Sequence, residues 1–495
     1  MRDGSVKKLL ARLLLPALLL GTLTGCGPEE VPAPLPDQTV QEPAQTPEAS
    51  PAAPQETAAA VLAVETAAGF DPYNTVSACN RLVLEMVLEP LFTVTEDGQA
   101  VPVLAEGWTV TPDGKTTEVL LRQDVVFHDG TPLSAEAVAD CVRRAAAGSV
   151  YAGRFYAVES VEAVDPRIVR FTTSKAYECF PLLLDIPITS GEEALPIGTG
   201  PYIWNGLERL LPSTVWWREG HPADQLITLH PVDGATDLRD GFQYGGVTAV
   251  WVDPNDSGAV HYTGEYELWD VPSAQLQYIG FNLEKGIFTS KKLRAAVTWA
   301  VDREAVVTED LSGFGVPAML VTLPGSVWDV PELKEGLGYD PSQLTGSLTA
   351  SGLTATMIVS SENAQRLISA ERIASQLTDC GIRVTVKPLS AAEFRSALQK
   401  GEFDLYYAEA RLSPTLDLSP FFSQNGALSY GGLASGELQN LCDLVLANRG
   451  NSYDLQKRIM EDGLLCPVAF KTTACYLHRG VFRAPTPKLG GWLWQ

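Results

Sequence analysis

The sequence predicts an α/β fold with more than one domain. The chain has 495 residues, enough for two to four domains of about 100–200 residues each. Apolar residues make up 45% of it and charged residues 19%, a balance typical of proteins that bury a sizeable core. Between residues 354 and 411, strand-like and helix-like segments alternate. This order favours parallel strands joined by right-handed crossovers.

The first 25 residues predict a secretion signal. Basic residues precede an apolar run of about 12 residues, which is shorter than the roughly 20 needed to span a bilayer. The run ends in Leu23-Thr24-Gly25-Cys26, which resembles the lipobox of bacterial lipoproteins. That resemblance implies cleavage before Cys26 and a diacylglycerol group on its sulfur. The alternative is an ordinary secretory signal in which this cysteine is a coincidence.

Residues 26–58 predict a disordered tether. Prolines lie among Glu, Gln, Thr and Ala, without any Lys or Arg. Such a segment buries too little apolar surface to offset its loss of conformational entropy. An extended tether of this length reaches at most about 100 Å. It would hold a globular body away from a membrane.

The globular part shows local strand, turn and helix patterns. Residues 93–190 contain short β-rich runs separated by turns such as Asp113-Gly114, and Ser134 is a candidate N-cap. Residues 289–311 predict one helix, capped by Thr289 or Ser290. The alternating segments after it are a strand at 355–359, a helix ending near Gly381, a strand at 382–386, a helix opened by a capping box at Ser390 and Glu393, and a strand at 403–407.

Charge and motif content exclude several classes of function. The formal net charge is −24, and so acidic a surface repels phosphates, which argues against nucleic acid as a partner. No HExxH, HxxH or GxSxG motif is present. Seven cysteines follow Cys26 without a CxxC pair. We expect most to be buried, and a single disulfide within Cys442, Cys466 and Cys475 stays open. The sequence thus predicts no catalytic residues, metal site or cofactor.

Several separated blocks, taken in order, resemble one protein family. They are Leu104-Ala105-Glu106-Gly107-Trp108, Pro112-Asp113-Gly114-Lys115, the run from Leu121 to Val138 around Phe127-His128-Asp129-Gly130, Gly198-Thr199-Gly200-Pro201-Tyr202, Phe281-Asn282, and the run from Leu293 to Ala305. Their order and spacing are similar to those of the family 5 extracellular solute-binding proteins of ABC importers, the group that binds peptides, dipeptides and nickel. The resemblance covers roughly residues 60–480.

The resemblance implies a two-lobed, periplasmic-binding-protein-like fold of type II with an extra subdomain in the first lobe. Crossing strands would join the lobes, one at Gly198–Pro201 and one at Tyr278–Phe281, and the lobes would close around a ligand by hinge bending. The implied division is a signal peptide at 1–25, a tether at 26–58, lobe I at 59–92 with 195–280 and 470–495, the extra subdomain at 93–194, and lobe II at 281–469.

The segment after the strand at 403–407 differs from the peptide-binding members of the family. Those members typically carry there a Trp and then an Asp that pairs with the α-amine of the peptide. Here Arg411 stands at the Trp position and Pro414 at the Asp position, so a buried ammonium group would lack its partner. Arg411 could instead bind a carboxylate or another anion, and Asp417 could bind the cation. The alternative for Arg411 is a salt bridge to Glu409 or Asp417.

The layout of the family implies further candidates for contact with a ligand in the cleft. They are Asn74, Thr75, Trp251, Tyr278, Asn282 and Tyr407. Asn74 and Thr75 follow the first strand, while Tyr278 and Asn282 flank an expected crossing strand. For each aromatic residue, packing in the core is the alternative.

The function implied is that of a lipid-anchored, monomeric solute-binding subunit outside the cytoplasm. It would capture an oligopeptide or another small polar solute without catalysis and deliver it to an ABC permease and ATPase complex. One alternative is a surface sensor or scaffold with the same fold and no transport role. A secreted hydrolase is a third interpretation, which the missing motifs disfavour.

Overall fold

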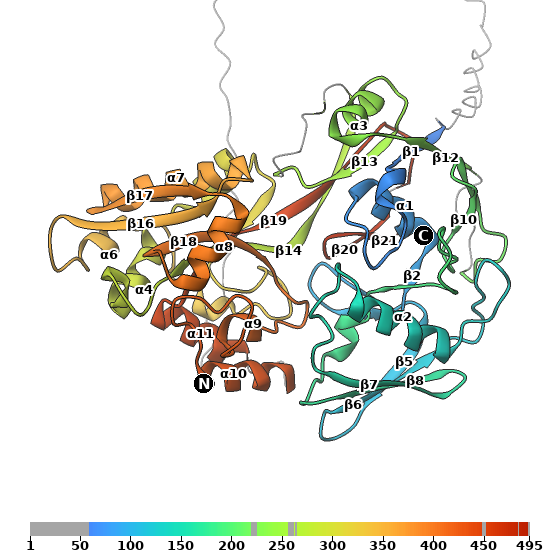
Figure 1. Ribbon diagram of the computed structural model, residues 1–495, viewed down its shortest axis with the longest axis horizontal. Coiled ribbons are helices and arrows are strands. Elements are labelled where there is room, and N and C mark those ends of the chain that lie inside the picture. The colour runs from blue at the N-terminus through green and yellow to red at the C-terminus, as the bar shows by residue number, and fades with distance from the viewer. Residues whose placement is uncertain are drawn as a thin grey trace, which may run out of the picture. The chain divides into compact units, whose positions relative to one another are not determined.

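The computed structural model describes residues 59–218, 225–255, 262, 265–447, 452–483 and 485–493, all within one compact unit, Thr57–Gln495. The predicted signal peptide, Cys26 and the tether lie outside these residues. Within the described part, an eleven-stranded mixed sheet links the two halves seen in Figure 1. Its strands are, in spatial order, β10 (Tyr202–Asn205), β11 (Arg209–Pro212), β12 (Ile227–Pro231), β1 (Ala60–Val64), β13 (Ala249–Val252), β19 (Leu465–Leu477), β14 (Glu267–Phe281), β18 (Leu405–Arg411), β16 (Leu353–Ser360) and β17 (Ile382–Leu389), with β15 (Gly315–Pro317) paired to β19.

The first half is built on strand β1, which pairs in parallel with both β12 and β13. Helix α1 (Ala78–Val87) packs against this part of the sheet, and α3 (Gly234–Gln243) follows β12. The Ser77 hydroxyl accepts a hydrogen bond from the Asn80 N–H and so begins α1. Its apolar residues, including Leu82 and Val83, are buried. The start of α1 therefore has a fixed position beside the sheet.

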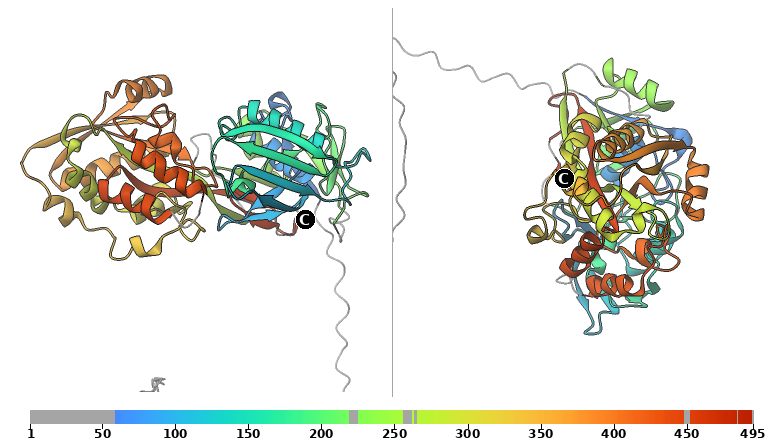
Figure 2. Two further views of the ribbon diagram at one scale, coloured as in Figure 1. Left: turned by 90° about the horizontal axis from the view of Figure 1, so that it is seen from below. Right: turned by 90° about the vertical axis from the view of Figure 1, so that its left-hand side faces the viewer.

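A separate four-stranded antiparallel sheet lies within the range predicted to hold short strands (Figures 1 and 2). Its strands are β5 (Ala105–Val110), β6 (Thr116–Leu121), β8 (Ile168–Thr173) and β7 (Val158–Asp165) in spatial order. Gly114 has φ +71°, so the Asp113-Gly114 turn between β5 and β6 uses the left-handed region that glycine tolerates. Helix α2 (Ala135–Ala147) packs against β7 and β8, and Ser134 caps it, as predicted.

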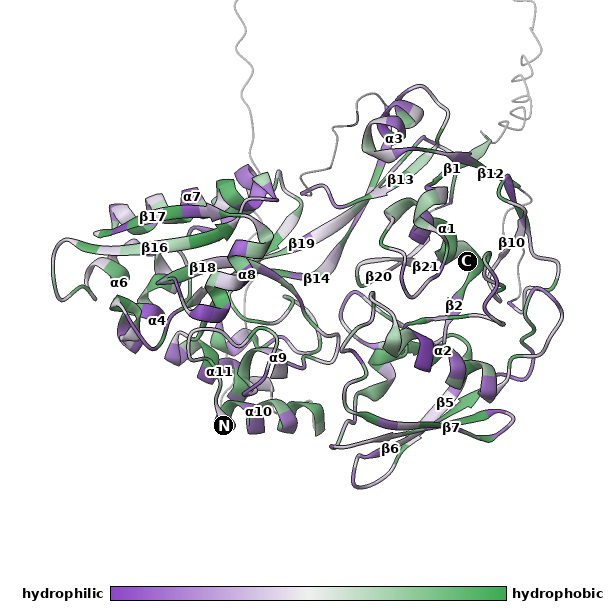
Figure 3. Ribbon diagram, in the orientation of Figure 1, coloured by the Kyte–Doolittle hydropathy of each residue, from purple (hydrophilic) through white to green (hydrophobic). Residues whose placement is uncertain are grey.

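The alternating segments of the second half confirm the sequence interpretation. Strand β16 pairs in parallel with both β17 and β18. Helix α7 (Ala364–Asp379) joins β16 to β17, and Gly381 follows it with φ +104°. Helix α8 (Ala391–Lys400) has the predicted capping box at Ser390 and Glu393. Figure 3 shows the apolar character of β16, whose inner residues are buried beneath these helices.

Two predictions about local structure were wrong. The single helix at 289–311 is broken: α4 (Lys291–Ala300) ends, and Asp302 then caps a new start by accepting a hydrogen bond from the Ala305 N–H. A side chain that offers its own hydrogen bond to the backbone favours such a restart. Gly198–Pro201 is not a crossing strand. A Cβ added at Gly198 would lie 2.0 Å from the Val87 carbonyl oxygen, so this segment packs tightly against the end of α1.

The crossing strands are β14 and β19, which are long and pair antiparallel from Glu267 and Leu477 to Gly280 and Leu465. Figure 1 shows both running from one half to the other. The predicted crossing strand at Tyr278–Phe281 is thus the end of β14. The ladder skips between the pairs Pro272–Thr472 and Leu276–Phe470, which is a bulge of the kind that redirects side chains.

Smaller elements complete the described part. They are β2 (Glu89–Pro90), β3 (Phe92–Val94), β4 (Ala100–Pro102), β9 (Pro187–Ile188), β20 (Thr486–Lys488), β21 (Gly491–Leu493), α5 (Arg303–Ala305), α6 (Pro341–Thr345), α9 (Ser419–Phe422), α10 (Gly436–Ala447), α11 (Ser452–Asp462), a π-helical turn at Val306–Asp310 and 3₁₀ turns at Thr66–Ala68, Phe180–Leu183, Ile287–Thr289 and Pro331–Leu333. The seven cysteines in this part are buried and form no disulfide with one another, so Cys442, Cys466 and Cys475 are not bridged. None of the helices described has the length and apolar character needed to cross a membrane.

Candidate ligand-binding site

A cavity of about 270 Å³ lies where β18 ends at Arg411, and we call it the Arg411 pocket. Its lining comes from segments far apart in the chain: Val76, Ala78, Arg81, Arg154, Asp185, Trp251, Val252, Asp253, Ser273, Ala274, Gln275, Arg411, Leu412, Pro414, Thr472, Thr473, Leu489 and Gly490. Helix α1 and strand β13 contribute from the first half, β18 contributes from the second, and the crossing strands lie between them. A molecule bound here would contact both halves.

Arg81 and Trp251 form one wall of the Arg411 pocket. Arg81 lies in the first turn of α1, which Ser77 caps. The guanidinium carbon of Arg81 lies 4.9 Å from the centroid of the Trp251 ring, a cation–π contact. Trp251 is buried and packs edge-on against Trp492 at 5.8 Å. The aromatic platform beneath Arg81 is therefore held by the core.

Arg411 presents a second cation to the same cavity. Its side chain is open to solvent within the pocket, although protein surrounds it closely enough that burial, with Arg81 and Arg154, lowers its pKa. A guanidinium group stays charged despite such a shift. Among the described residues, the side chains of Arg81 and Arg411 have no ion pair and no hydrogen bond. Arg411 therefore does not form the salt bridge to Glu409 or Asp417 that was its alternative.

The third arginine of the pocket is neutralised. Arg154 pairs with Asp185 at 2.5 Å, and its guanidinium carbon lies 5.3 Å from the centroid of the Tyr151 ring. The Arg154 side chain is 14% exposed and the Asp185 side chain 29%. Asp185 is thus committed to a protein cation and is not a free carboxylate of the cavity.

The Asp253 carboxylate in the pocket wall is also paired. Lys471 lies at the bulge of β19, and its carbonyl accepts a hydrogen bond of 2.7 Å from the Ser273 hydroxyl. The buried Lys471 ammonium group pairs with Asp253 and, at 3.4 Å, with Glu409, which also pairs with Arg366 at 3.3 Å. Burial raises the pKa of Asp253, and the Lys471 charge opposes that rise. The charges of this network are therefore paired with one another within the protein.

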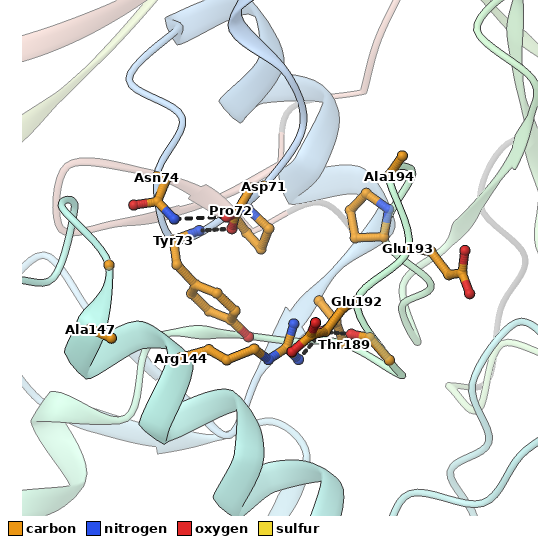
Figure 4. A pocket seen from close by; sticks show the side chains of 13 residues that line it. Asp71, Pro72, Tyr73, Asn74, Arg144, Ala147, Thr189, Glu192, Glu193 and Ala194 are labelled. Carbon is orange, nitrogen blue, oxygen red and sulfur yellow. Dashed lines mark hydrogen bonds between the residues drawn. The ribbon is translucent and has the colours of Figure 1, made fainter.

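A second cavity of about 450 Å³ contains Asn74 (Figure 4). The Asn74 amide donates a hydrogen bond of 2.7 Å to Asp71. Arg144 of α2 donates to the Thr189 hydroxyl at 2.7 Å and lies 5.2 Å from the centroid of the Tyr73 ring. Asn74 therefore lies in a cavity of the first half that is distinct from the Arg411 pocket.

Four other predicted residues are built into the interior. Thr75 is buried. Tyr278 packs edge-on against Tyr406 and Phe421 at 5.8 and 5.4 Å. The Asn282 amide donates to the carbonyls of Gly401 and Phe403, and the Tyr407 hydroxyl donates to the Gln277 side chain at 2.8 Å. None of the four lines the Arg411 pocket.

Asp417 lies in a separate group of polar side chains, which we call the Asp417 cluster: Tyr156, Lys175, Asp417, Gln439 and Asp443. The Tyr156 hydroxyl donates to Asp417 at 2.6 Å, and Lys175 pairs with Asp443 at 2.9 Å. Burial and the Asp417 charge raise the pKa of Tyr156 to about 12. Burial alone would lower the pKa of Lys175, but Asp417 and its other partners raise it overall.

The structure thus brings Arg411 and Trp251 together and places the other predicted residues elsewhere. The sequence interpretation did not single out Arg81, Arg154 or Asp185. Arg81 precedes an apolar helical run, where a single cation is usually a solvated residue. Its one local signal is that it stands in the first helical turn, where the positive end of the helix dipole makes arginine unfavourable.

Comparisons with known proteins agree with this fold. A family model described as bacterial extracellular solute-binding proteins, family 5 Middle, matches residues 99–428. The glutathione-binding protein GsiB of Salmonella typhi is 28% identical over 360 residues, which is 67% of this chain and 69% of that protein.

Two solved structures share the fold at lower identity. NikA from Brucella suis in complex with Fe(III)-EDTA has a TM-score of 0.65 and 21% identity, covering 84% of this chain and 95% of that one. MppA, a periplasmic murein tripeptide binding protein in its unliganded open form, has a TM-score of 0.71 and 17% identity, covering 86% and 93%. These likenesses confirm the predicted two-lobed α/β fold.

Proposed function

Because the chain belongs to the family 5 bacterial extracellular solute-binding proteins, which serve ABC importers, we propose that it captures a peptide-like or other small polar solute in the Arg411 pocket. The relatives are binding proteins of transporters, and the chain is likewise no enzyme. It acts outside the cytoplasm, as the family does. In this proposal it works as a monomer and hands the solute to a permease and its ATPase.

One observation carries the choice of pocket. The Arg411 pocket is lined by α1 and β13, by β18 and by both crossing strands. A solute held there is desolvated by both halves at once, which is how a binding protein couples capture to closure. The second cavity, which contains Asn74, is lined only from the first half.

The relatives support a peptide-like solute. GsiB is described as binding glutathione and MppA as binding a murein tripeptide. Both ligands are small peptides. Arg411 and Pro414 line the pocket of this chain, so its solute is held through contacts other than a carboxylate at position 414.

A panel of solutes tests capture. Full-length protein in detergent is heated with glutathione, di- and tripeptides, amino-acid derivatives, oligosaccharides and nickel–histidine. A solute at 100 times its Kd should add about 2.7 kcal/mol to the free energy of unfolding. Trp251→Leu should weaken binding of that solute, whereas the matched surface variant Trp108→Leu should leave its binding unchanged. Absence of any stabilising solute across the panel contradicts the proposal.

Transport separates this proposal from a surface sensor or scaffold. In cells that lack the gene, uptake of the solute found in the panel should be lost and then restored by the wild-type protein. Unchanged uptake in those cells would favour the sensor.

We further propose that a diacylglycerol on Cys26 anchors the protein to the outer face of the cell membrane. The support is the Leu23-Thr24-Gly25-Cys26 motif. Cells fed radiolabelled palmitate should label the wild-type protein but not Cys26→Ser, and the variant should leave the membrane fraction. Equal membrane retention of the variant would contradict the anchor.

A further inference from the structure

We propose that the solute carries two anionic groups, typically carboxylates, and that Arg81 binds one while Arg411 binds the other. This inference rests on the proposed function and specifies the class of solute. It arises from an excess of positive charge in the lining of the Arg411 pocket.

The imbalance follows from the pairing of each charged side chain that lines the cavity. Asp185 is taken by Arg154 at 2.5 Å, and Asp253 is taken by Lys471. Arg81 and Arg411 form no ion pair with any described residue, and Arg411 is repelled by Arg81 and by Arg154 more than it is attracted by Asp185. Two like charges in a partly desolvated cavity are unfavourable until anions reach them. The lining of the Arg411 pocket therefore favours the binding of negative charge.

The placement of Arg81 leaves its hydrogen-bonding edge available. Its guanidinium carbon lies 4.9 Å from the centroid of the Trp251 ring, and no described residue accepts a hydrogen bond from its N–H groups. Those N–H groups form a fork that matches the two oxygens of a carboxylate. Trp251 thus holds Arg81 for anion binding without competing for its donors.

The two arginines stand on different halves of the protein. Arg81 belongs to α1, and Arg411 ends β18, where it pairs with Gln275 of crossing strand β14. A solute with an anion at each end would neutralise both cations and bridge the halves. A solute with one anion would leave one arginine unpaired, so the second anion adds affinity and favours closure.

The lining also disfavours a solute with an unpaired ammonium group. Both carboxylates of the cavity, Asp185 and Asp253, are already committed to protein cations. The wall of the pocket also includes apolar groups such as Leu412 and the exposed Val76. The class that fits is a small dicarboxylate with a peptide-like or aliphatic middle, including a peptide whose second carboxylate comes from an acidic side chain.

Calorimetric titration with esters of one compound tests the charge requirement. The probes are N-acetylglutathione, its glycine monoethyl ester and its diethyl ester, with N-acetyl-Ala-Glu and N-acetyl-Ala-Gln as a second pair, so that no probe carries an ammonium group. We expect the affinity of full-length protein to fall at least about tenfold for each carboxylate removed, the size of a lost charge-assisted hydrogen bond. N-acetyl-Ala-Glu should bind more tightly than N-acetyl-Ala-Gln.

Substitution of each arginine tests the assignment. Arg81→Gln and Arg411→Gln should each lower dicarboxylate affinity at least about tenfold, and each should abolish the difference between the diacid and one of its monoesters. Arg411→Lys should restore only part of the loss, because lysine lacks the fork. Arg383→Gln, which removes an exposed arginine of β17, is the matched control and should leave affinity unchanged.

The outcomes separate this inference from the proposed function. If neutral peptides or esters bind as tightly as the diacids, or if both arginine variants keep full affinity, the dianion inference is overturned while solute capture stands. If no compound of the wider panel binds, both are overturned. A fall in affinity as salt rises, seen for diacids and absent for esters, would support the inference further.

Discussion

The Arg411 pocket and the Asp417 cluster contain the same kinds of side chain but balance them differently. In the Asp417 cluster, Lys175 pairs with Asp443, and Tyr156 donates to Asp417. In the pocket, Arg81 and Arg411 form no ion pair with any described residue, and Asp185, which attracts Arg411, is itself paired with Arg154. The charges of the Asp417 cluster are paired within the protein. Those of Arg81 and Arg411 would be paired by a bound ligand.

This difference teaches where charged residues do structural work and where they are available for a ligand. Arg411 is the last residue of strand β18, and Asp417 follows it six positions later. Sequence position therefore does not separate the two roles. The contacts across the molecule do, because Asp417 meets Tyr156 from before β7 while Arg411 meets an open cavity.

The largest loss of stability should come from removing Lys471, whose ammonium group is paired with two carboxylates beside the Arg411 pocket. Lys471→Met leaves Asp253 and Glu409 without the buried ammonium group between them. Removing one partner of a buried pair costs about 3–5 kcal/mol, so we expect a loss of about 3 kcal/mol in the free energy of unfolding, measured with urea. Lys285→Met, at an exposed position, is the control. A loss below 1 kcal/mol would mean that water replaces Lys471 without penalty.

The second-largest loss of stability should come from a substitution in the Asp417 cluster. Asp417→Leu leaves Lys175 and Tyr156 without the carboxylate they share. Because the Lys175 side chain is 22% exposed, the cost is smaller than for a fully buried pair, about 2 kcal/mol. Urea unfolding measures it. Solute affinity should change little, and a large loss of affinity with normal stability would move Asp417 from the structural class to the ligand site.

The Tyr156 hydroxyl should contribute to a loss of stability at high pH, as do other tyrosines whose pKa burial raises. Its pKa is raised from 10 to about 12, so the folded state holds the proton more tightly than the unfolded state. Stability from this difference is fully present below pH 10 and is lost as the pH rises through about 12. Tyr156→Phe should make the loss of stability above pH 10 smaller than in the wild-type protein, seen as melting temperature against pH. An equal fall in both proteins would show that Tyr156 does not contribute to it.

The smallest effect on stability should come from the pocket itself. Arg411→Gln removes a cation that forms no ion pair with any described residue and that Arg81 and Arg154 each repel more than Asp185 attracts it. We expect the solute-free protein to keep its free energy of unfolding within about 0.5 kcal/mol or to gain slightly. A loss above 1 kcal/mol would show that Arg411 has a structural role, and the contrast with Asp417 would fail.

The fold could be predicted where local signals agree. The capping box at Ser390, the left-handed Gly381 and the alternating apolar residues all act within a few positions. The break at Asp302 could not, because the apolar spacing of residues 289–311 continues through it. Arg303 is fully buried there and donates to the distant carbonyls of Ala318 and Pro467, and that long-range contact overrides the local periodicity.

The candidate site could be predicted only in part for the same reason. Arg411 stood out because it occupies a position that differs from the family pattern, and Trp251 because a strand places it near the cleft. Arg81 gains its significance from Trp251, 170 positions later, and from Arg411 beyond it. Which cations are left unpaired depends on such distant partners, so a single sequence does not reveal it.

The bulge between β14 and β19 has a mechanical consequence. A continuous hydrogen-bonded ladder is stiff, whereas a gap in it bends easily. The gap lies at Ser273–Gln275 opposite Lys471. Ser273, Ala274 and Gln275 also line the Arg411 pocket. Bending at this bulge would therefore move residues that line the Arg411 pocket. Binding of the solute and movement of the two halves would then depend on the same segment.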